Sequence, residues 1–514
     1  MQYLYETAFH LRPTFSKAGR RLHCASLAAG LAFLIASGLF VGCGGSNSSN
    51  TAPPPVPSIQ NINSSTDPSS PVNLPIEING SGFQSSPGSV IFSQSSSGIT
   101  ATVTPNAGGW TDSGIAVVVP AGNGTNNFTV PGTVSVTVKT SGGTSNAVTL
   151  TLVQTLTFDV NNVTWSQTTP LPTPLTGLRA AAVPISDTSA YVVVTGGYDG
   201  TANTNGVYVG TLDTTGAVTG WTASANVLPE TIAHHAMVEA DAENSLVPDG
   251  SHFIYVIGGQ INSTDAPGGT GDVYMASVDN SGAVGTWQKL SSSLPEPLVG
   301  PAAALFNGYV YVVGGLHPDG TPSADVFSAP IKSDGTLGTW TKSTSAYPTA
   351  VSFATAFGFA GKLYVLGGDN SNSTNPDEEG SQGSGIQSVN FASALNGVVG
   401  TWTATSSTIK NRKKQITWTA FGQVIDAEGI YNGSPGSLEL ERTVVNPDST
   451  LASWNGITNA VNLINANVYN AAAIVSPLQS PNATPRFLLF GGQAFNGLPS
   501  GGAPSALVYY NTAP

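Results

Sequence analysis

The sequence predicts an all-β protein, and three observations support this fold class. Only 9% of the 514 residues are charged, well below the roughly 25% of a typical soluble chain, whereas Gly (60) and Pro (35) are abundant. Apolar residues alternate or form short runs between Gly, Pro and Asn. Patterns with a helical period are almost absent after residue 42. We therefore expect short strands joined by many turns, in a chain long enough for more than one domain.

The first 42 residues are the exception, and they predict an export signal. Lys17, Arg20 and Arg21 precede an uncharged apolar run over residues 25–42, which is the arrangement of a secretory signal peptide. The run ends in small residues at Cys43, and a stretch rich in Gly, Ser and Asn follows.

This ending resembles the lipobox of bacterial lipoproteins. The resemblance implies a signal peptide over residues 1–42 and a lipid on the thiol of Cys43, which would anchor the mature chain in a membrane. Gly44 stands where an Asp marks inner-membrane retention in such lipoproteins, which implies the outer membrane or the cell surface. A secretory signal cleaved nearby is the alternative. The chain has two cysteines, Cys24 and Cys43, so no disulfide is expected in the mature protein.

Residues 43–57 predict a flexible tether, because their Gly, Ser, Asn and Pro leave nothing to bury. Short strands follow over residues 58–155. Val134, Val136 and Val138 alternate with polar residues and predict a strand with one buried face, as in half of a sandwich. The phrases "INGSGF", "WTDSGIAVVVPAG" and "GTVSVTVKTSGGTSN" occur here in this order. Their order resembles the IPT/TIG family, which implies an immunoglobulin-like β-sandwich that acts as a spacer or a protein-contact module.

A phrase that ends in tryptophan recurs through the rest of the chain. The stretch "SGAVGTW" ends at Trp287, and the related tryptophans, 52–66 residues apart, are Trp165, Trp221, Trp340, Trp402 and Trp454. Such a period in an all-β chain predicts the four-stranded blades of a β-propeller. Apolar strands end in Gly-Gly in phase with it, at residues 196–197, 258–259, 314–315, 367–368 and 491–492. We expect the glycine pairs to turn with positive φ and the indoles to fill the space between blades.

The order of these phrases resembles the kelch-repeat β-propeller over residues 156–514. Five Gly-Gly strands and six tryptophans imply six blades, with a degenerate fifth blade that keeps a single Gly429; seven blades is the alternative. The last blade lacks its tryptophan strand, and residues 156–165 have no blade of their own. We therefore expect these residues to complete the last sheet and close the ring.

The loops of such a ring supply the candidate ligand-binding residues. The loop before each first strand and the loop after each Gly-Gly are expected on the same face, where function tends to lie. Aromatic, amide and carboxylate groups there suit sugar recognition. The predicted contacts are Arg179, Tyr198, Asp199, His235, His317, Asp369, Arg412 and Trp418.

Several of these signals have a second interpretation. His234-His235 suits acid–base chemistry, but a structural role is the favoured one. The sequence "NRKK" at 411–414 suits an acidic sugar or phosphate, although a solvated loop is expected. The acidic stretch 369–380 lacks the spacing of a calcium loop, so no metal is predicted, and no cofactor either. The net charge of −13 without a basic stripe predicts no binding of nucleic acid.

Together these patterns predict a lipid-anchored, surface-exposed protein, expected to be monomeric, that binds a carbohydrate or a protein through the propeller loop face. Two alternatives stay open. One is a carbohydrate-active enzyme of the epimerase or hydrolase kind at the channel mouth, for which no catalytic residue is assigned. The other is an envelope scaffold without a small ligand.

Overall fold

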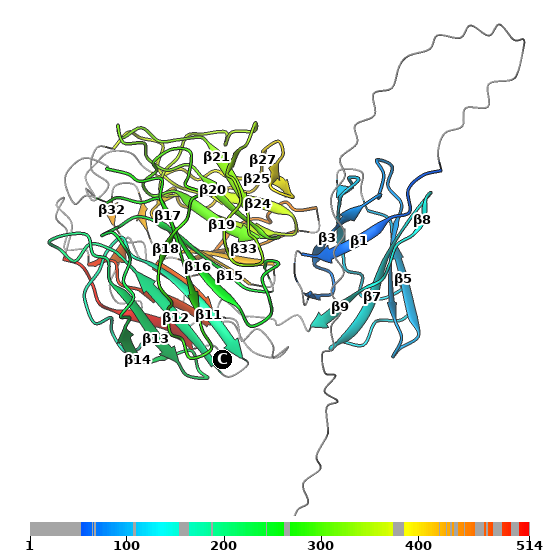
Figure 1. Ribbon diagram of the computed structural model, residues 1–514, viewed down its shortest axis with the longest axis horizontal. Coiled ribbons are helices and arrows are strands. Elements are labelled where there is room, and N and C mark those ends of the chain that lie inside the picture. Colours follow the sequence, from blue (N-terminus) through cyan, green and yellow to red (C-terminus); the bar gives the residue numbers. More distant parts are fainter. Residues whose placement is uncertain are drawn as a thin grey trace, which may run out of the picture. The chain divides into compact units, whose positions relative to one another are not determined.

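A computed structural model describes residues 53–512 with internal gaps (Figure 1). The signal peptide predicted for residues 1–42, Cys43 and most of the tether lie outside the described residues. The gaps are at 64, 66–67, 106–108, 154–163, 187–188, 243, 262–267, 374–384, 421, 428, 432–433, 436–439, 447, 458–466, 469–470, 476–485 and 495–502. The named elements are all β-strands, as the composition predicts. Within these residues, no helix has the length and apolarity needed to cross a membrane.

Two sheets lie in residues 58–153. The first has the order β1-β3-β6 and comprises β1 (Ser58–Ile62), β3 (Pro75–Ser81) and β6 (Gly114–Val118). The second has the order β2-β9-β7-β4-β5 and comprises β2 (Ser69–Pro71), β9 (Val148–Val153), β7 (Gly132–Thr140), β4 (Ser89–Gln94) and β5 (Ile99–Val103), with β8 (Gly143–Thr144) paired to β7. One apolar cluster draws residues from both sheets. Val134, Val136 and Val138 of β7 are buried in it, which confirms the predicted alternation.

Six antiparallel sheets follow in residues 164–512. Sheet I comprises β11 (Arg179–Ser186), β12 (Ser189–Thr195), β13 (Val207–Leu212) and β14 (Val218–Ala223). Sheet II comprises β15 (Ala236–Ala240), β16 (His252–Ile257), β17 (Val273–Val278) and β18 (Gln288–Lys289). Sheet III comprises β19 (Ala302–Phe306), β20 (Tyr309–Val313), β21 (Val326–Pro330) and β22 (Thr341–Lys342).

The other three sheets repeat this order with local changes. Sheet IV comprises β23 (Thr355–Phe359), β24 (Lys362–Leu366), β25 (Val389–Leu395), β26 (Val398–Val399) and β27 (Thr403–Ala404). Sheet V comprises β29 (Ile416–Ala420), β30 (Gln423–Ala427), β33 (Leu440–Val444) and β34 (Asn455–Ile457). Sheet VI comprises β36 (Ala471–Val475), β37 (Arg486–Phe490), β39 (Val508–Thr512) and β10 (Thr164–Gln167). Short pairings join β28 (Arg412–Lys413), β31 (Ile430–Tyr431) and β32 (Ser434–Pro435), and β35 (Asn467–Val468) with β38 (Gln493–Ala494).

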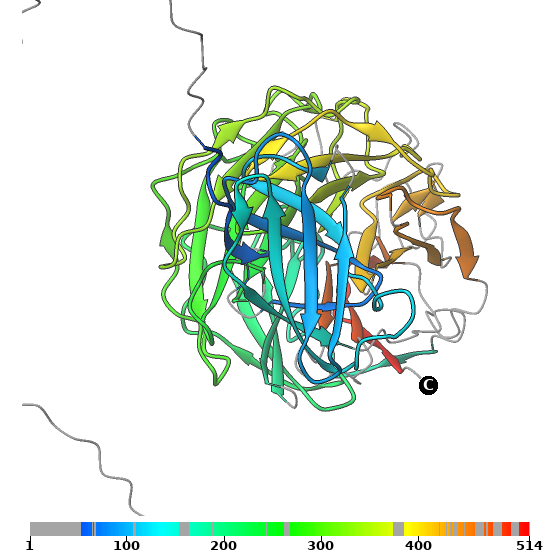
Figure 2. The ribbon, with the colours of Figure 1, turned by 90° about the vertical axis from the view of Figure 1, so that its right-hand side faces the viewer.

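The first strands of the six sheets contact one another in a closed cycle. The cycle runs β11, β15, β19, β23, β29, β36 and back to β11. Figure 2 shows the sheets following one another in colour order from green through yellow and orange to red. Sheet VI closes with a strand from the start of this region, since Thr164 pairs with Thr512 and Gln167 with Tyr509. The expectation that the N-terminal strand completes the last sheet is therefore confirmed.

The glycine pairs link five of the six sheets to the following sheet. All five pairs have positive φ at both residues, as predicted, for example 58° and 102° at Gly196 and Gly197. The N–H of the second glycine donates to a carbonyl oxygen of the following sheet at 2.8–2.9 Å. These bonds run from Gly197 to Ile232, Gly259 to Leu298, Gly315 to Val351, Gly368 to Arg412 and Gly492 to Leu175.

The tryptophans join neighbouring sheets a second time. The indole N–H groups of four of them donate to carbonyl oxygens that lie just after the preceding tryptophan in the sequence. These bonds run from Trp221 to Thr169, Trp340 to Ser292, Trp402 to Ser345 and Trp454 to Ser406, at 3.0–3.3 Å. An indole here fills space and also satisfies a backbone acceptor, so the repeated phrase is structural.

Candidate functional site

A series of backbone hydrogen bonds links the residues that precede the first strands. In sheets II to V, the residue two positions before the first strand donates its N–H to the carbonyl oxygen of the equivalent residue in the preceding sheet, at 2.8–3.0 Å. The series runs Gly177, His234, Gly300, Phe353 and Lys414, and all five have φ between 52° and 63°. Residues other than glycine seldom adopt a positive φ, so the hydrogen bonds between neighbouring sheets must hold this conformation in place.

The two glycines of this series have a steric reason. A Cβ atom on Gly177 would come within 2.8 Å of the His234 ring, and one on Gly300 within 2.5 Å of the Phe353 ring. The two glycines therefore leave room for the aromatic rings of the following sheets. The rings of His234 and Phe353 are in turn packed edge to face, with centroids 5.5 Å apart.

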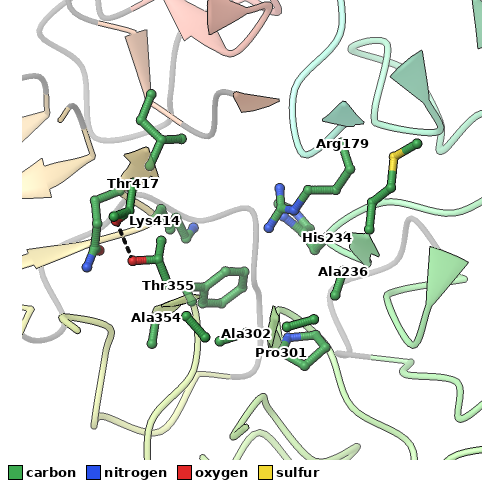
Figure 3. Close-up of a pocket in the computed structure, with 15 residues that line it drawn as sticks. Arg179, His234, Ala236, Pro301, Ala302, Ala354, Thr355, Lys414 and Thr417 are labelled. Atoms are coloured by element: carbon green, nitrogen blue, oxygen red, sulfur yellow. Dashed lines mark hydrogen bonds between the residues drawn. The ribbon is translucent and has the colours of Figure 1, made fainter. Parts of the chain in front are cut away.

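A pocket of about 160 Å³ lies beside these residues, at the ends of β11, β15, β19, β23 and β29 (Figure 3). Small residues account for much of its wall, including Ala236, Ala302, Ala303, Ala354 and Ala356. Its polar lining residues are Arg179, His234, Thr355, Lys414, Gln415 and Thr417. The volume is close to the roughly 150 Å³ of an engineered cavity that holds benzene, so the pocket has room for one ring.

Two cationic side chains reach the pocket from opposite sides. Figure 3 shows Arg179 and His234 on one side, and Lys414, Thr355 and Thr417 on the other. One guanidinium nitrogen of Arg179 donates to the carbonyl oxygen of Leu178 at 2.9 Å. Burial lowers the pKa of Arg179 to about 10, which still leaves the group charged at neutral pH. The Lys414 ammonium lies 4.7 Å from the centroid of the Phe353 ring.

A chain of hydroxyl groups links the pocket to a buried carboxyl group. The hydroxyls of Thr355 and Thr417 are 2.6 Å apart, and the Thr417 hydroxyl also donates to Asp426 Oδ1 at 3.1 Å. Asp426 is fully buried, and burial raises its pKa to about 7 despite the positive charge of Arg412. The protonation state of Asp426 therefore decides whether this chain presents a donor or an acceptor to the pocket.

Asp426 belongs to an ionic triad in the interior of sheet V. Arg412 Nη2 lies 3.2 Å from Glu441 Oε1, and Arg412 Nη1 lies 4.0 Å from Asp426 Oδ2. Glu441 also accepts hydrogen bonds from the N–H groups of Ile409 and Lys410. All three charged side chains are 1% exposed.

The same three positions are apolar in sheet II. The strand registers make Ile232, Val256 and Tyr274 equivalent to Arg412, Asp426 and Glu441. Those three residues of sheet II belong to one hydrophobic cluster. Sheet V thus carries buried charged side chains where sheet II has a hydrophobic core. Burying charges is costly, and departures of this kind occur at functional or strained sites.

The structure places four of the predicted ligand-binding residues on the loops after the glycine pairs. Tyr198 is half-buried, and Asp199 is exposed and accepts two backbone N–H groups of its own turn. His317 Nδ1 lies 3.4 Å from Glu296 Oε2. Asp369 is buried and lies 2.6 Å from Lys413 Nζ. Isolated bridges pair these loops with those before the first strands, such as Thr176 with Tyr198, so both loops emerge on one face as expected.

The remaining predicted residues differ in their access to the pocket. Arg179 lines it, whereas Arg412 lies in the ionic triad. Trp418 is 1% exposed, and its ring packs at a tilt against those of Trp165 and Phe487, with centroids 5.7 and 5.5 Å away. Ligand contact by any of these residues stays a prediction.

The two adjacent histidines point in different directions. His234 lines the pocket, and His235 is fully buried, with Nε2 sharing a 2.9 Å hydrogen bond with the Thr195 hydroxyl of sheet I. Burial, with the charges of Arg179 and His234, holds the pKa of His235 well below its usual value. A neutral His235 thus joins sheets I and II, in line with the favoured structural role.

The cluster "NRKK" is not the solvated loop that the sequence analysis expected. Arg412, Lys413 and Lys414 are all buried, with 1–8% exposure. Arg412 and Lys413 pair with the carboxylates of Glu441 and Asp369, and Lys414 faces the pocket. The prediction was wrong because Glu441 and Asp369 are distant in sequence from the cations that they pair with. The ion pairs therefore could not be predicted from the local sequence.

Thr355, Thr417 and Asp426 are residues that the sequence analysis missed. A signal existed for the two threonines, which replace alanine in the repeated first strands.

Elsewhere in the described residues, Glu239, Asp241 and His252 bring possible metal ligands within 4.8 Å of one another, although His252 Nδ1 already donates to Glu239 at 2.9 Å. No protein-family model matches the chain, and a comparison with curated proteins finds none similar to it.

Proposed function

We propose that this protein is a lipid-anchored binding protein of the bacterial cell surface. In this proposal residues 58–155 form an IPT/TIG immunoglobulin-like domain that serves as a spacer. Residues 156–514 form a six-bladed kelch-like β-propeller, one blade for each of sheets I to VI. The closed cycle of first strands and the pairing of β10 with β39 support this arrangement.

The ligand of the propeller is a carbohydrate, bound in the pocket at the loop face. The observation that carries this proposal is the pocket itself, which combines apolar walls with a few convergent polar groups. The Phe353 ring, the hydroxyls of Thr355 and Thr417 and the amide of Gln415 supply the two kinds of contact that sugars need. A protein ligand on the same face is the other form of this proposal.

A glycan array probed with the full-length protein in detergent tests the proposal. Ala303→Leu enlarges a small wall residue of the pocket and should abolish retention on the array, because the added atoms fill the space for a ligand. Ala181→Leu, in the first strand of sheet I and outside the pocket lining, is the matched variant for overpacking alone. Retention that survives Ala303→Leu would place the ligand elsewhere, and silence of the wild type would favour a scaffold.

One observation favours an enzyme as the second candidate. The buried carboxyl group of Asp426 communicates with the pocket through two hydroxyls, and its pKa of about 7 suits proton transfer. Incubation of retained glycans with the protein distinguishes the candidates. A changed product that is lost in Asp426→Asn indicates an epimerase or hydrolase, and unchanged glycans indicate a binding protein.

The anchor is tested separately by cell fractionation. Cys43→Ala should move the protein from the membrane fraction to the soluble fraction or the medium, because the lipid has no other attachment point in this proposal. Cys24→Ala is the matched control and should leave fractionation unchanged. Membrane association that persists in Cys43→Ala would contradict lipidation.

A further inference from the structure

The internal repeat allows equivalent positions of one chain to be compared with each other. The first residue of the first strand is Arg179 in sheet I and, in the other five sheets, Ala236, Ala302, Thr355, Ile416 and Ala471. Two positions earlier, the described residues are Gly177, His234, Gly300, Phe353 and Lys414. A permanent cation thus replaces a small or neutral residue once in each series, and both replacements line the same pocket.

Arg179 has no carboxylate partner among the described residues of the pocket. None of the described lining residues is acidic, although the chain as a whole carries a net charge of −13. Lys289, Lys342, Arg412 and Lys413 each have a carboxylate oxygen within 4 Å. Arg179 forms no ion pair with any residue in the described part of the chain. A largely buried guanidinium without an acidic partner is costly, and an anionic ligand would remove that cost.

The rest of the pocket fits the neutral part of a sugar. The Thr355–Thr417 hydroxyl pair can exchange hydrogen bonds with a ring hydroxyl. Met237 and Pro301 supply apolar surface to the lining, and the volume admits one ring.

We propose that the pocket binds an anionic monosaccharide, with its carboxylate or phosphate facing Arg179 and Lys414 and a ring hydroxyl at Thr355 and Thr417. This inference rests on the proposed carbohydrate binding and goes beyond it by naming the charge of the ligand. Arg179 supplies a planar pair of donors, and Lys414 supplies a point charge.

Isothermal titration of the full-length protein in detergent tests the inference with matched sugars. Glucuronate and glucose 6-phosphate carry the two possible anions, and glucose is the neutral parent of both. We expect at least tenfold tighter binding of one anionic sugar than of glucose. Arg179→Met should remove this preference, Arg179→Lys should keep part of it, and Lys342→Gln, which removes a charge outside the pocket, should leave it unchanged. Thermal unfolding of each variant confirms that it is folded.

The outcomes separate the inference from the function on which it rests. A preference for glucuronate or for glucose 6-phosphate that Arg179→Met abolishes supports the inference and identifies the anion. Equal binding of glucose, lost in Ala303→Leu, overturns the inference and leaves carbohydrate binding intact. A preference that Arg179→Met leaves unchanged also overturns it. Absence of binding by all three sugars overturns it as well, and the glycan array then decides the function.

Discussion

The N–H of Gly492 donates a hydrogen bond to the carbonyl oxygen of Leu175 at 2.9 Å, and this bond joins the last of six sheets to the first. Four equivalent bonds join sheets I to V in succession, so the junction formed by the two ends of this region has the same backbone hydrogen bond as those four junctions. The ring therefore depends on residues more than 300 positions apart in the sequence, and its closure can be tested by single substitutions.

Trp165 should be the most sensitive position at this closure. Its side chain is 1% exposed and lies 5.7 Å from the ring of Trp418, so Trp165→Ala should lower the free energy of unfolding by about 3–5 kcal/mol. Urea denaturation followed by circular dichroism measures the loss. Trp402→Ala changes a half-buried indole between sheets III and IV and should cost less. Equal losses would show that Trp165 has no special part in closure.

Substituting all three residues of the ionic triad of sheet V together should preserve stability, whereas substituting Arg412 alone should not. Arg412→Ile alone leaves Asp426 and Glu441 buried without their cation and should cost about 3–5 kcal/mol. The triple variant Arg412→Ile, Asp426→Val, Glu441→Gln copies two apolar residues of sheet II. Glutamine keeps an acceptor for the N–H groups of Ile409 and Lys410. We expect the triple variant to be at least as stable as the wild type in urea, and a loss as large as that of Arg412→Ile would contradict this account.

His235 should make the protein less stable as the pH falls. Its folded pKa is held well below the usual value of 6.5, so below about pH 6.5 the unfolded chain takes up a proton that the folded chain does not. The free energy of unfolding then decreases by up to about 1.4 kcal/mol per pH unit. His235→Gln, which copies Gln415 at the equivalent position of sheet V, should remove this slope between pH 7.5 and 5.5 in urea titrations. An unchanged slope would assign the pH dependence to other groups.

Asp426 should make the protein less stable as the pH rises, which is opposite to the effect of His235. Its folded pKa is about 7 against an ordinary value of 3.8, so between these values the unfolded chain releases a proton that the folded chain keeps. Stability from this group is present below about pH 4 and is lost as the pH rises to 7. Asp426→Asn should therefore gain stability relative to the wild type over this range. Asp279→Asn is the control, because a hydrogen bond from Ser281 lowers the pKa of that exposed carboxyl group and reverses the sign. A wild-type-like profile for Asp426→Asn would contradict the assignment.

The sequence predicted the features of the fold that repeat. Glycine pairs, tryptophan phrases and the orphan strand near Trp165 each follow from local chemistry or from counting, and the structure agrees on the positive φ angles and on the pairing of β10 with β39. A repeated element occurs several times in one chain, so its pattern can be recognised even where the sequence of one copy diverges.

The candidate site was less predictable because it consists of departures from the repeat. Lys414 and Thr417 are ordinary residues in sequence, and only the closed cycle of first strands brings them beside Arg179. Likewise, nothing local relates Arg412 to Glu441, which lies 29 residues away on another strand. Comparison of each position with its equivalents in the other sheets would have marked the charged residues. Lys414 stands where other sheets have Gly, His or Phe, and Arg412 and Glu441 stand where sheet II has Ile and Tyr.

The pairing of β10 with β39 also has a consequence for synthesis. Residues 164–167 leave the ribosome more than 300 residues before their partner strand. The nascent chain must therefore keep an unpaired strand from associating with other molecules until its C-terminus is available. Contacts of such high sequence separation slow folding, and sheet VI cannot be completed until β39 has been made.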